Sequence, residues 1–293
     1  MKELKISSPV KLNNIDKLKS EAYDKIMNDK IVRAFIKEKE IPLSFVNDNL
    51  GLFLRMVEEN EPCATCKSFQ DCKKVNLQKG YLTFVDADET IYYEKCKYYK
   101  QFLEIANLYQ YKDFPDEKIF LNYRQSDLVD QPTRTMYVMI LKSILENHSL
   151  YISSKENMDL LTDLLISGVN SSIKNKKVIF INSTNLKDKA DRYNKYDQDK
   201  FFKLKDDVFN ADILVIDSLG SEGNSEFYKY SFLMDLLTYR NAHHSTTFIS
   251  SYFDIDQLQE VYSGYNLMNK TKLLIEKIKE YFEIIKFETI LRR

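Results

Sequence analysis

Glycine and proline are scarce in this chain of 293 residues, which has six glycines, five prolines and no tryptophan. Because glycine and proline interrupt helices and strands, their scarcity predicts a chain that is mostly regular and rich in helix. Hydrophobic residues make up 44% of the chain, and aromatic residues recur throughout it, which excludes an intrinsically disordered protein. The length favours about two domains.

An excess of charge of either sign is also missing. Lysine and arginine number 43 against 44 aspartates and glutamates, so the formal net charge is −1. A dedicated binder of double-stranded DNA usually has a strong basic excess, so any contact with nucleic acid would have to be local. No run approaches the roughly 18 apolar residues of a membrane span, and no apolar segment of a secretory signal follows Met1. We therefore expect a cytoplasmic protein without a membrane partner.

Cysteine is absent from most of the chain, and its four copies lie close together, at Cys63, Cys66, Cys72 and Cys96. Disulfides are uncommon in the cytoplasm, where clustered cysteines more often bind metal. The first pair has the two-residue spacing of a zinc knuckle, and the other two would complete a tetrahedral four-thiolate zinc site. A filled site of this kind has no open position for catalysis and is structural. The alternative is a set of buried free cysteines.

Hydrophobic periodicity predicts an N-terminal α+β domain over residues 1–111. Two apolar stripes, one at Ile31, Phe35 and Ile36 and one from Leu50 to Val57, predict amphipathic helices between residues 16 and 58. We interpret both stripes as core packing, with a partner-binding surface as the alternative. Short strands are expected at 81–85 and 90–93, and helix over 100–111. Residues 112–134, which contain two prolines, are the expected linker.

The remainder, residues 135–293, alternates between strands and helices. Such alternation predicts an α/β domain with a mostly parallel sheet covered on both faces. The expected strands are 150–152, 178–181, 213–216, 247–250 and 283–288, and the expected helices are 136–146, 160–171, 227–240 and 269–281.

A carboxylate at the end of one expected strand raises the question of nucleotide binding. Asp217 follows the aliphatic strand 213–216, as does the magnesium-holding carboxylate of a P-loop ATPase. The phosphate loop that should accompany it, G-x-x-x-x-G-K-[ST], is missing. The window Ser154–Leu161 has the right length but no glycine, and Leu160 and Leu161 stand in the lysine and serine/threonine positions. Residues other than glycine do not freely adopt the positive φ of a phosphate nest. We therefore expect ATP and magnesium to bind weakly or not at all, and no catalytic residue.

The chain resembles the DnaI family of bacterial primosomal proteins, which load the replicative helicase. In the first half, the similar segments are Ile31–Ile36, Cys63–Cys72 and Gly80–Cys96. In the second half, Ala211–Glu222 resembles the family's Walker B region, and Tyr239–Arg240 with Thr246–Asp254 resembles its arginine finger and sensor 1. The resemblance covers most of the chain. It implies an AAA+ domain after a zinc domain that contacts the hexameric replicative helicase.

The resemblance also implies roles for single residues and further partners. Asp217 and Arg240 would be remnants of a nucleotide site, with Arg240 as the finger that acts on a neighbouring subunit. Taken alone, Arg240 is as well explained by a solvated cation at a helix C-terminus. Single-stranded DNA and self-association through the AAA+ domain are further expected partners. Because several nucleotide-handling positions are altered together, we expect a loader-like adaptor without ATP hydrolysis. The alternatives are an ATP-dependent loader with a divergent pocket and a zinc-containing regulator that binds nucleic acid.

Overall fold

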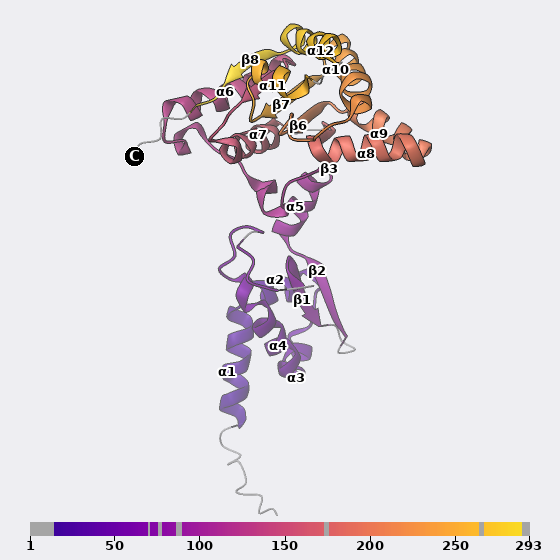
Figure 1. Ribbon diagram of the computed structural model, residues 1–293. Helices are drawn as coiled ribbons and strands as arrows, with labels where there is room; N and C mark the ends of the chain where they lie inside the picture. Colours follow the sequence, from indigo (N-terminus) through magenta and orange to yellow (C-terminus); the bar gives the residue numbers. More distant parts are fainter. Residues whose placement is uncertain are drawn as a thin grey trace, which may run out of the picture. The chain divides into compact units, whose positions relative to one another are not determined.

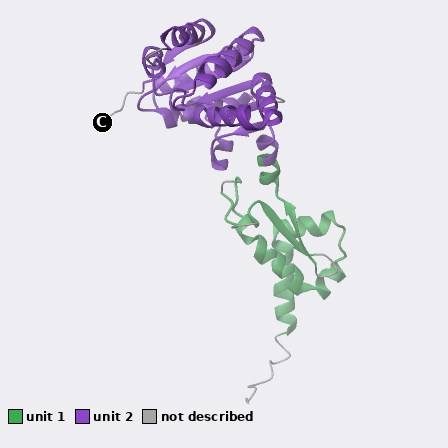
Figure 2. Ribbon diagram, turned by 45° about the vertical axis from the view of Figure 1, so that its right-hand side comes forward, with its two compact units in different colours: residues 1–102 green, residues 103–293 purple. Residues whose placement is uncertain are grey.

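The computed structural model describes residues 15–288, except residues 70, 76–77, 86–89, 173–175 and 264–266. It divides into two compact units, Met1–Phe102 and Leu103–Arg293, which Figure 2 colours separately. Figure 1 labels the elements of both units. In the part of the chain that is described, no helix combines the length and the apolar character that crossing a membrane requires.

Unit 1 consists of helices followed by a β-hairpin. Its elements are α1 (Ile15–Asn28), α2 (Lys30–Glu38), α3 (Leu43–Asp48), α4 (Leu50–Asn60), the 3-10 turn η2 (Glu61–Cys63), β1 (Tyr81–Val85), β2 (Ile91–Lys95) and, as far as Phe102, α5 (Lys97–Ala106). Helix α2 begins after Asp29, whose side chain accepts hydrogen bonds from the first backbone N–H groups. Strands β1 and β2 pair antiparallel, as the sequence predicts.

The apolar stripes of unit 1 form its core. Phe35 of α2 stacks on Phe84 of β1 with ring centroids 4.3 Å apart, and Phe53 of α4 is 1% exposed. Residues from all four N-terminal helices and from β1 join the same cluster. The interpretation of both stripes as core packing is confirmed.

Unit 2 is built on a six-stranded sheet in the order β3–β5–β6–β7–β4–β8, in which every neighbouring pair is parallel. The strands are β3 (Tyr109–Lys112), β4 (Leu150–Ser153), β5 (Val178–Asn182), β6 (Ile213–Asp217), β7 (Thr246–Ser251) and β8 (Glu283–Lys286). The predicted mostly parallel sheet is therefore confirmed. The hydrophobic runs at 178–181 and 213–216 form β5 and β6, which are neighbours inside the sheet.

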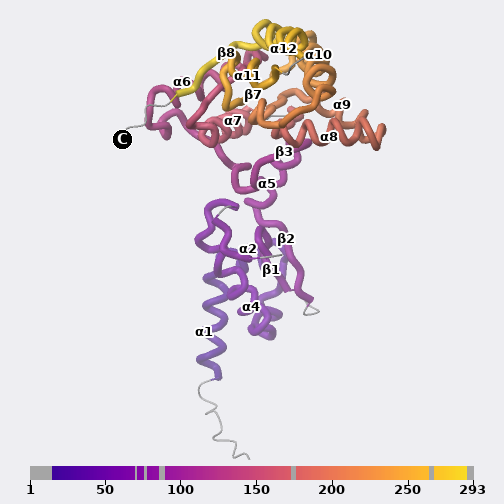
Figure 3. The backbone as a smooth tube through the Cα atoms, viewed as in Figure 1, coloured from indigo at the N-terminus to yellow at the C-terminus, as the bar shows by residue number. Residues whose placement is uncertain are grey.

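Helices cover both faces of this sheet. They are α6 (Gln131–Glu146), α7 (Met158–Ser172), α8 (Ser183–Tyr196), α9 (Gln198–Asn210), α10 (Met234–Ala242), α11 (Ile255–Tyr262) and α12 (Met268–Tyr281), with the π-helical segment η6 (Tyr228–Leu233) before α10. One face packs on α8 to α12 through a single cluster that includes Tyr151, Ile181 and Ile216. Helix α7 contacts β6 and β7 and packs beside α6. The tube in Figure 3 shows α8 and α9 side by side, joined by a short connection.

The segment between the expected domains differs from its prediction. Helix α5 ends at Ala106, and residues 109–111, expected as helix, belong to the edge strand β3 against β5. Residues 112–134, expected as a linker, pack on unit 2 and include the 3-10 turns η4 (Asp116–Phe120) and η5 (Gln125–Asp127). Asn170 of α7 donates to the carbonyls of Ile119 and Leu121, both at 2.9 Å. Pro115 therefore precedes a turn that is bound to a domain surface, whereas Pro132 lies in the first turn of α6.

Helices α6 and α7 approach each other closely at Gly168. A Cβ at this position would lie 2.6 Å from Cγ2 of Ile140, which is fully buried in α6. Because a β-branched side chain is stiff, Gly168→Ala should destabilise the protein by about 1–3 kcal/mol, measured by urea unfolding. Gly51 in α4 is the matched control, since nothing lies within 4 Å of its added Cβ. Gly51→Ala should be neutral or stabilise by up to about 1 kcal/mol. Equal stability of the Gly168→Ala chain and the parent would contradict this packing.

Candidate functional site

The carboxylate of Asp217 lies where the strands of the unit 2 sheet end. It accepts hydrogen bonds from Ser250 Oγ at 2.5 Å, Ser218 Oγ at 3.1 Å and Thr162 Oγ1 at 3.2 Å. These hydroxyls come from the end of β7, the residue after β6 and the second turn of α7. Open parallel sheets bind ligands at this edge, so Asp217 has the position of a site residue. In this structure its oxygens are used by the chain itself.

Thr162 corrects the predicted register of the phosphate loop. The window Ser154–Leu161 places a leucine in the serine/threonine position, whereas the structure places Thr162, one residue later, against Asp217. A P-loop Ser/Thr and the carboxylate of the neighbouring strand together hold magnesium in P-loop enzymes. With Thr162 in that position, Leu161 stands in the lysine position and Lys155 in that of the first glycine. A search one residue further along the sequence would have found this threonine.

The loop between β4 and α7 does not have the conformation that surrounds a phosphate chain. It consists of residues 154–157, and α7 begins at Met158, so a helical turn occupies most of the motif. Ser154 N–H donates to the carbonyl of Ser251, and Asn157 N–H to Ser154 Oγ. The adjacent cavities are about 10 and 260 Å³, and Glu156 and Glu288 line the larger one. Ligand pockets usually measure about 300–1,000 Å³, and carboxylates repel phosphate.

A buried glutamate, Glu222, holds the loop that follows Asp217. The sequence did not identify it as a site residue. Glu222 is 4% exposed, and it accepts hydrogen bonds from Ser183 Oγ at 2.8 Å and from Gly220 N–H at 2.7 Å. The hydroxyl of Tyr262 donates to its other oxygen. Glu222 thereby ties the loop after β6 to the start of α8 and the end of α11. Tyr252, in the segment that resembles sensor 1, is 43% exposed and follows β7, and it is Ser250 of the same segment that contacts Asp217.

Arg240 is buried in this structure and forms its hydrogen bonds within its own chain. Its side chain is 1% exposed, so the interpretation as a solvated cation is wrong. Its guanidinium donates to Thr247 Oγ1 at 2.8 Å and to four carbonyl oxygens. Those carbonyls belong to Val208, Phe209, Ala211 and Thr246. Burial lowers the pKa of Arg240 to about 10, which still leaves the guanidinium charged at neutral pH. The guanidinium makes these hydrogen bonds within its own chain. In this conformation it is therefore not available to act as an arginine finger on a neighbouring subunit.

The four cysteines of unit 1 line one cavity of about 630 Å³, together with residues from α2, β1 and the start of α5. Cys63 and Cys66 bracket a tight turn, in which Cys66 N–H donates to the carbonyl of Cys63 at 3.2 Å. Cys96 N–H donates to the carbonyl of Gly80 at 2.9 Å, which places the fourth cysteine beside the hairpin. Tyr99 N–H points at Cys96 Sγ, 3.4 Å away. The fold therefore brings together cysteines that are 33 positions apart in sequence.

The four thiols are chemically suited to bind a soft metal ion, although their arrangement among the described residues is not that of a closed metal site. Four thiols on one cavity are the ligands that zinc takes in structural sites. Within residues 15–288, apart from the undescribed positions, no group of three or more metal-binding side chains has the geometry of an ion site. Cys66 Sγ points at the carbonyl of Ser68, 3.0 Å away. Burial raises the pKa of the Cys63 thiol, and the nearby ammonium of Lys74 opposes this shift.

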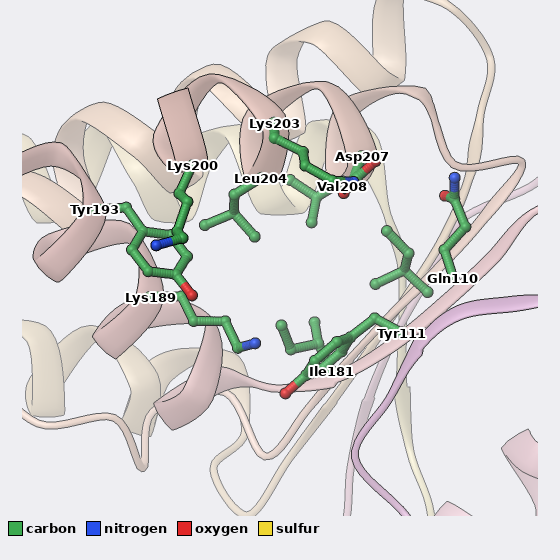
Figure 4. Close-up of a pocket in the computed structure, with 11 residues that line it drawn as sticks. Gln110, Tyr111, Ile181, Lys189, Tyr193, Lys200, Lys203, Leu204, Asp207 and Val208 are labelled. Atoms are coloured by element: carbon green, nitrogen blue, oxygen red, sulfur yellow. Dashed lines mark hydrogen bonds and ion pairs between the residues drawn. The ribbon is translucent and has the colours of Figure 1, made fainter. Parts of the chain in front are cut away.

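Another cavity of unit 2, of about 290 Å³, lies between the edge of the sheet and the α8–α9 pair (Figure 4). The apolar residues Ile181 and Leu204 line it from opposite sides, and lysines stand around its rim. Lys200 pairs with Asp197 and Lys203 with Asp207, so two of the rim charges are compensated. Lys189 lies over the ring of Tyr111 at 4.0 Å.

Comparison with models of protein families and with curated protein sequences gives no match. Among solved structures, the crystal structure of DnaI aligns with 64% of this chain and 98% of its own, with 22% identity and a TM-score of 0.51. The crystal structure of the DnaC helicase loader covers 58% of this chain and 99% of its own, at 16% identity and a TM-score of 0.46. AMPPCP-bound DnaA from Aquifex aeolicus covers 58% of this chain and 51% of its own, at 14% identity and a TM-score of 0.44. Over 64% of its length, the chain therefore shares its fold with the DnaI crystal structure, as the sequence resemblance implies.

Proposed function

We propose that this chain is a helicase-loader-like adaptor of DNA replication, in which unit 1 binds the replicative DNA helicase and unit 2 no longer hydrolyses ATP. The observation that carries the proposal is the fold shared with DnaI, combined with a helical turn where a phosphate loop would lie. A retained scaffold with an altered pocket favours a role in binding over a role in catalysis. Unit 1 also offers the cavity lined by cysteines, which in our proposal holds one zinc ion through Cys63, Cys66, Cys72 and Cys96.

The helicase interaction is tested with the full chain. The chain is mixed with the purified hexameric replicative helicase of the same organism, and complexes are separated by size-exclusion chromatography with light scattering. We expect a stable complex that forms without added nucleotide. Absence of a complex at micromolar concentrations, with and without ATP, would overturn the proposal. Formation of a complex only with ATP would favour an active loader instead.

An ATP-dependent loader is the second candidate, because Thr162 and Asp217 retain the arrangement of a magnesium-binding pair. Calorimetry with ATP and magnesium separates the two candidates. We expect no binding at micromolar ATP, because the four-residue loop offers no phosphate nest. Micromolar binding that disappears in Asp217→Ala would establish the second candidate. Binding that survives this substitution would indicate a nucleotide site elsewhere.

A further inference from the structure

Lys74, two residues after Cys72, is a buried cation. The residue is only 6% exposed. Its Nζ donates hydrogen bonds to Tyr81 O at 2.9 Å, Asn60 Oδ1 at 3.0 Å and Thr83 Oγ1 at 3.3 Å. An ammonium group has three protons, so each proton has one acceptor. Asn60 is itself fixed, because its side chain hydrogen-bonds both the N–H and the carbonyl of Thr83. The position of the ammonium is therefore well defined.

The charge of Lys74 has no partner of opposite sign among the side chains that the structure describes. All three of its acceptors are neutral, and no described carboxylate forms an ion pair with it. A buried charge is costly unless an opposite charge compensates it. The ammonium therefore has all its hydrogen bonds satisfied, by Asn60, Tyr81 and Thr83. These neutral groups do not balance its positive charge.

The cysteines are the groups that can supply the missing negative charge. Tyr81, which accepts from Lys74, lines the same cavity as the four cysteines. Asn60 ends α4, and η2 leads from it directly to Cys63. Four thiolates around one divalent zinc ion leave a net charge of about −2, which needs a nearby cation.

We propose that Lys74 is a positioning residue whose charge stabilises an anionic four-thiolate zinc centre. This inference rests on the zinc centre of the proposed function. It goes beyond that centre by assigning a residue that is not a ligand and by requiring all four cysteines to bind as thiolates. Residues around the ligands typically change metal affinity by about 10–100-fold when they are replaced.

The test compares three variants of the full chain with the parent. Lys74→Gln removes the charge and keeps an N–H donor, and Lys74→Arg keeps the charge. Lys73→Gln is the matched control, because Lys73 is exposed and lies next to both Lys74 and Cys72. The zinc dissociation constant is measured at neutral pH by competition with a chromophoric chelator. Far-UV circular dichroism at saturating zinc confirms that each variant is folded.

We expect Lys74→Gln to weaken zinc binding by about 10–100-fold, while Lys74→Arg and Lys73→Gln stay within about threefold of the parent. Unchanged affinity in folded Lys74→Gln would overturn the inference. An equal loss of zinc affinity in Lys74→Arg would also overturn it, and so would a Lys74→Gln chain that stays unfolded at saturating zinc. Either result would mean that Lys74 holds the fold of the loop and does not act through its charge. A parent chain that binds no zinc would instead refute the centre itself.

Discussion

Replacing Cys72 with Ser should remove zinc from the freshly purified chain and abolish its complex with the helicase. The other three cysteines share a cavity with Cys72, so losing one thiolate opens the proposed tetrahedral site. Structural zinc contributes about 10–16 kcal/mol in zinc-finger peptides, so the local fold of unit 1 depends on a complete ligand set. We expect about one zinc per parent chain by elemental analysis and less than about half an equivalent in the variant.

Val75→Ser is the control for this experiment. Val75 lies three residues after Cys72 and is 68% exposed, so its replacement should change neither zinc content nor helicase binding. A Cys72→Ser chain that retains a full equivalent of zinc would show that Cys72 is not a ligand. Loss of zinc without loss of helicase binding would separate the metal centre from the binding surface.

Replacing Arg240 with Met should destabilise the chain by about 3–5 kcal/mol. The substitution removes a guanidinium that serves four buried carbonyl oxygens, and each buried acceptor left without a partner costs about 1–3 kcal/mol. For a unit of this size, the expected fall in Tm is on the order of 10 °C. Arg240→Lys should lose nearly as much, because a lysine ammonium has three donors and lacks the planar fork.

The matched control is Arg192→Met, on the exposed surface of α8, which should change stability by less than about 0.5 kcal/mol. Unfolding in urea is followed by circular dichroism in each variant. An Arg240→Met chain with the stability of the parent would show that these hydrogen bonds contribute nothing net. A normal Tm together with disturbed self-association would return Arg240 to the finger role.

Strands β5 and β6 of unit 2 were predictable because their apolar runs are continuous. Residues 178–181 and 213–216 are entirely hydrophobic, and buried parallel strands have this pattern. Helix α8 is strongly hydrophilic and has few apolar residues, and the edge strand β3 is only four residues long. Short elements of this kind depend on the partner that they pair with, here β5.

The sequence predicted which types of residue form the candidate sites, but it predicted few of the contacts that these residues make. The cysteine spacing predicted a common location, and the structure places all four on one cavity. The partners of Arg240 lie near 208–211 and 246–247, and only the packing of α9, α10 and β7 brings them together. Thr162 was missed because a motif without glycines leaves its register undefined. Lys74 was missed because sequence does not show which lysine is buried.

The β4–α7 connection has enough residues for a phosphate loop, and it differs in conformation. Eight residues separate the end of β4 from Thr162, and four of them, 158–161, form the first turn of α7. Met158 and Leu161 are buried, which anchors this turn to the core. An open loop at this place therefore needs no insertion. Glycines within 158–161, each costing the helix about 1 kcal/mol, would shift a local helix–coil equilibrium toward it, and the two conformations of the connection would be separated by the melting of one helical turn.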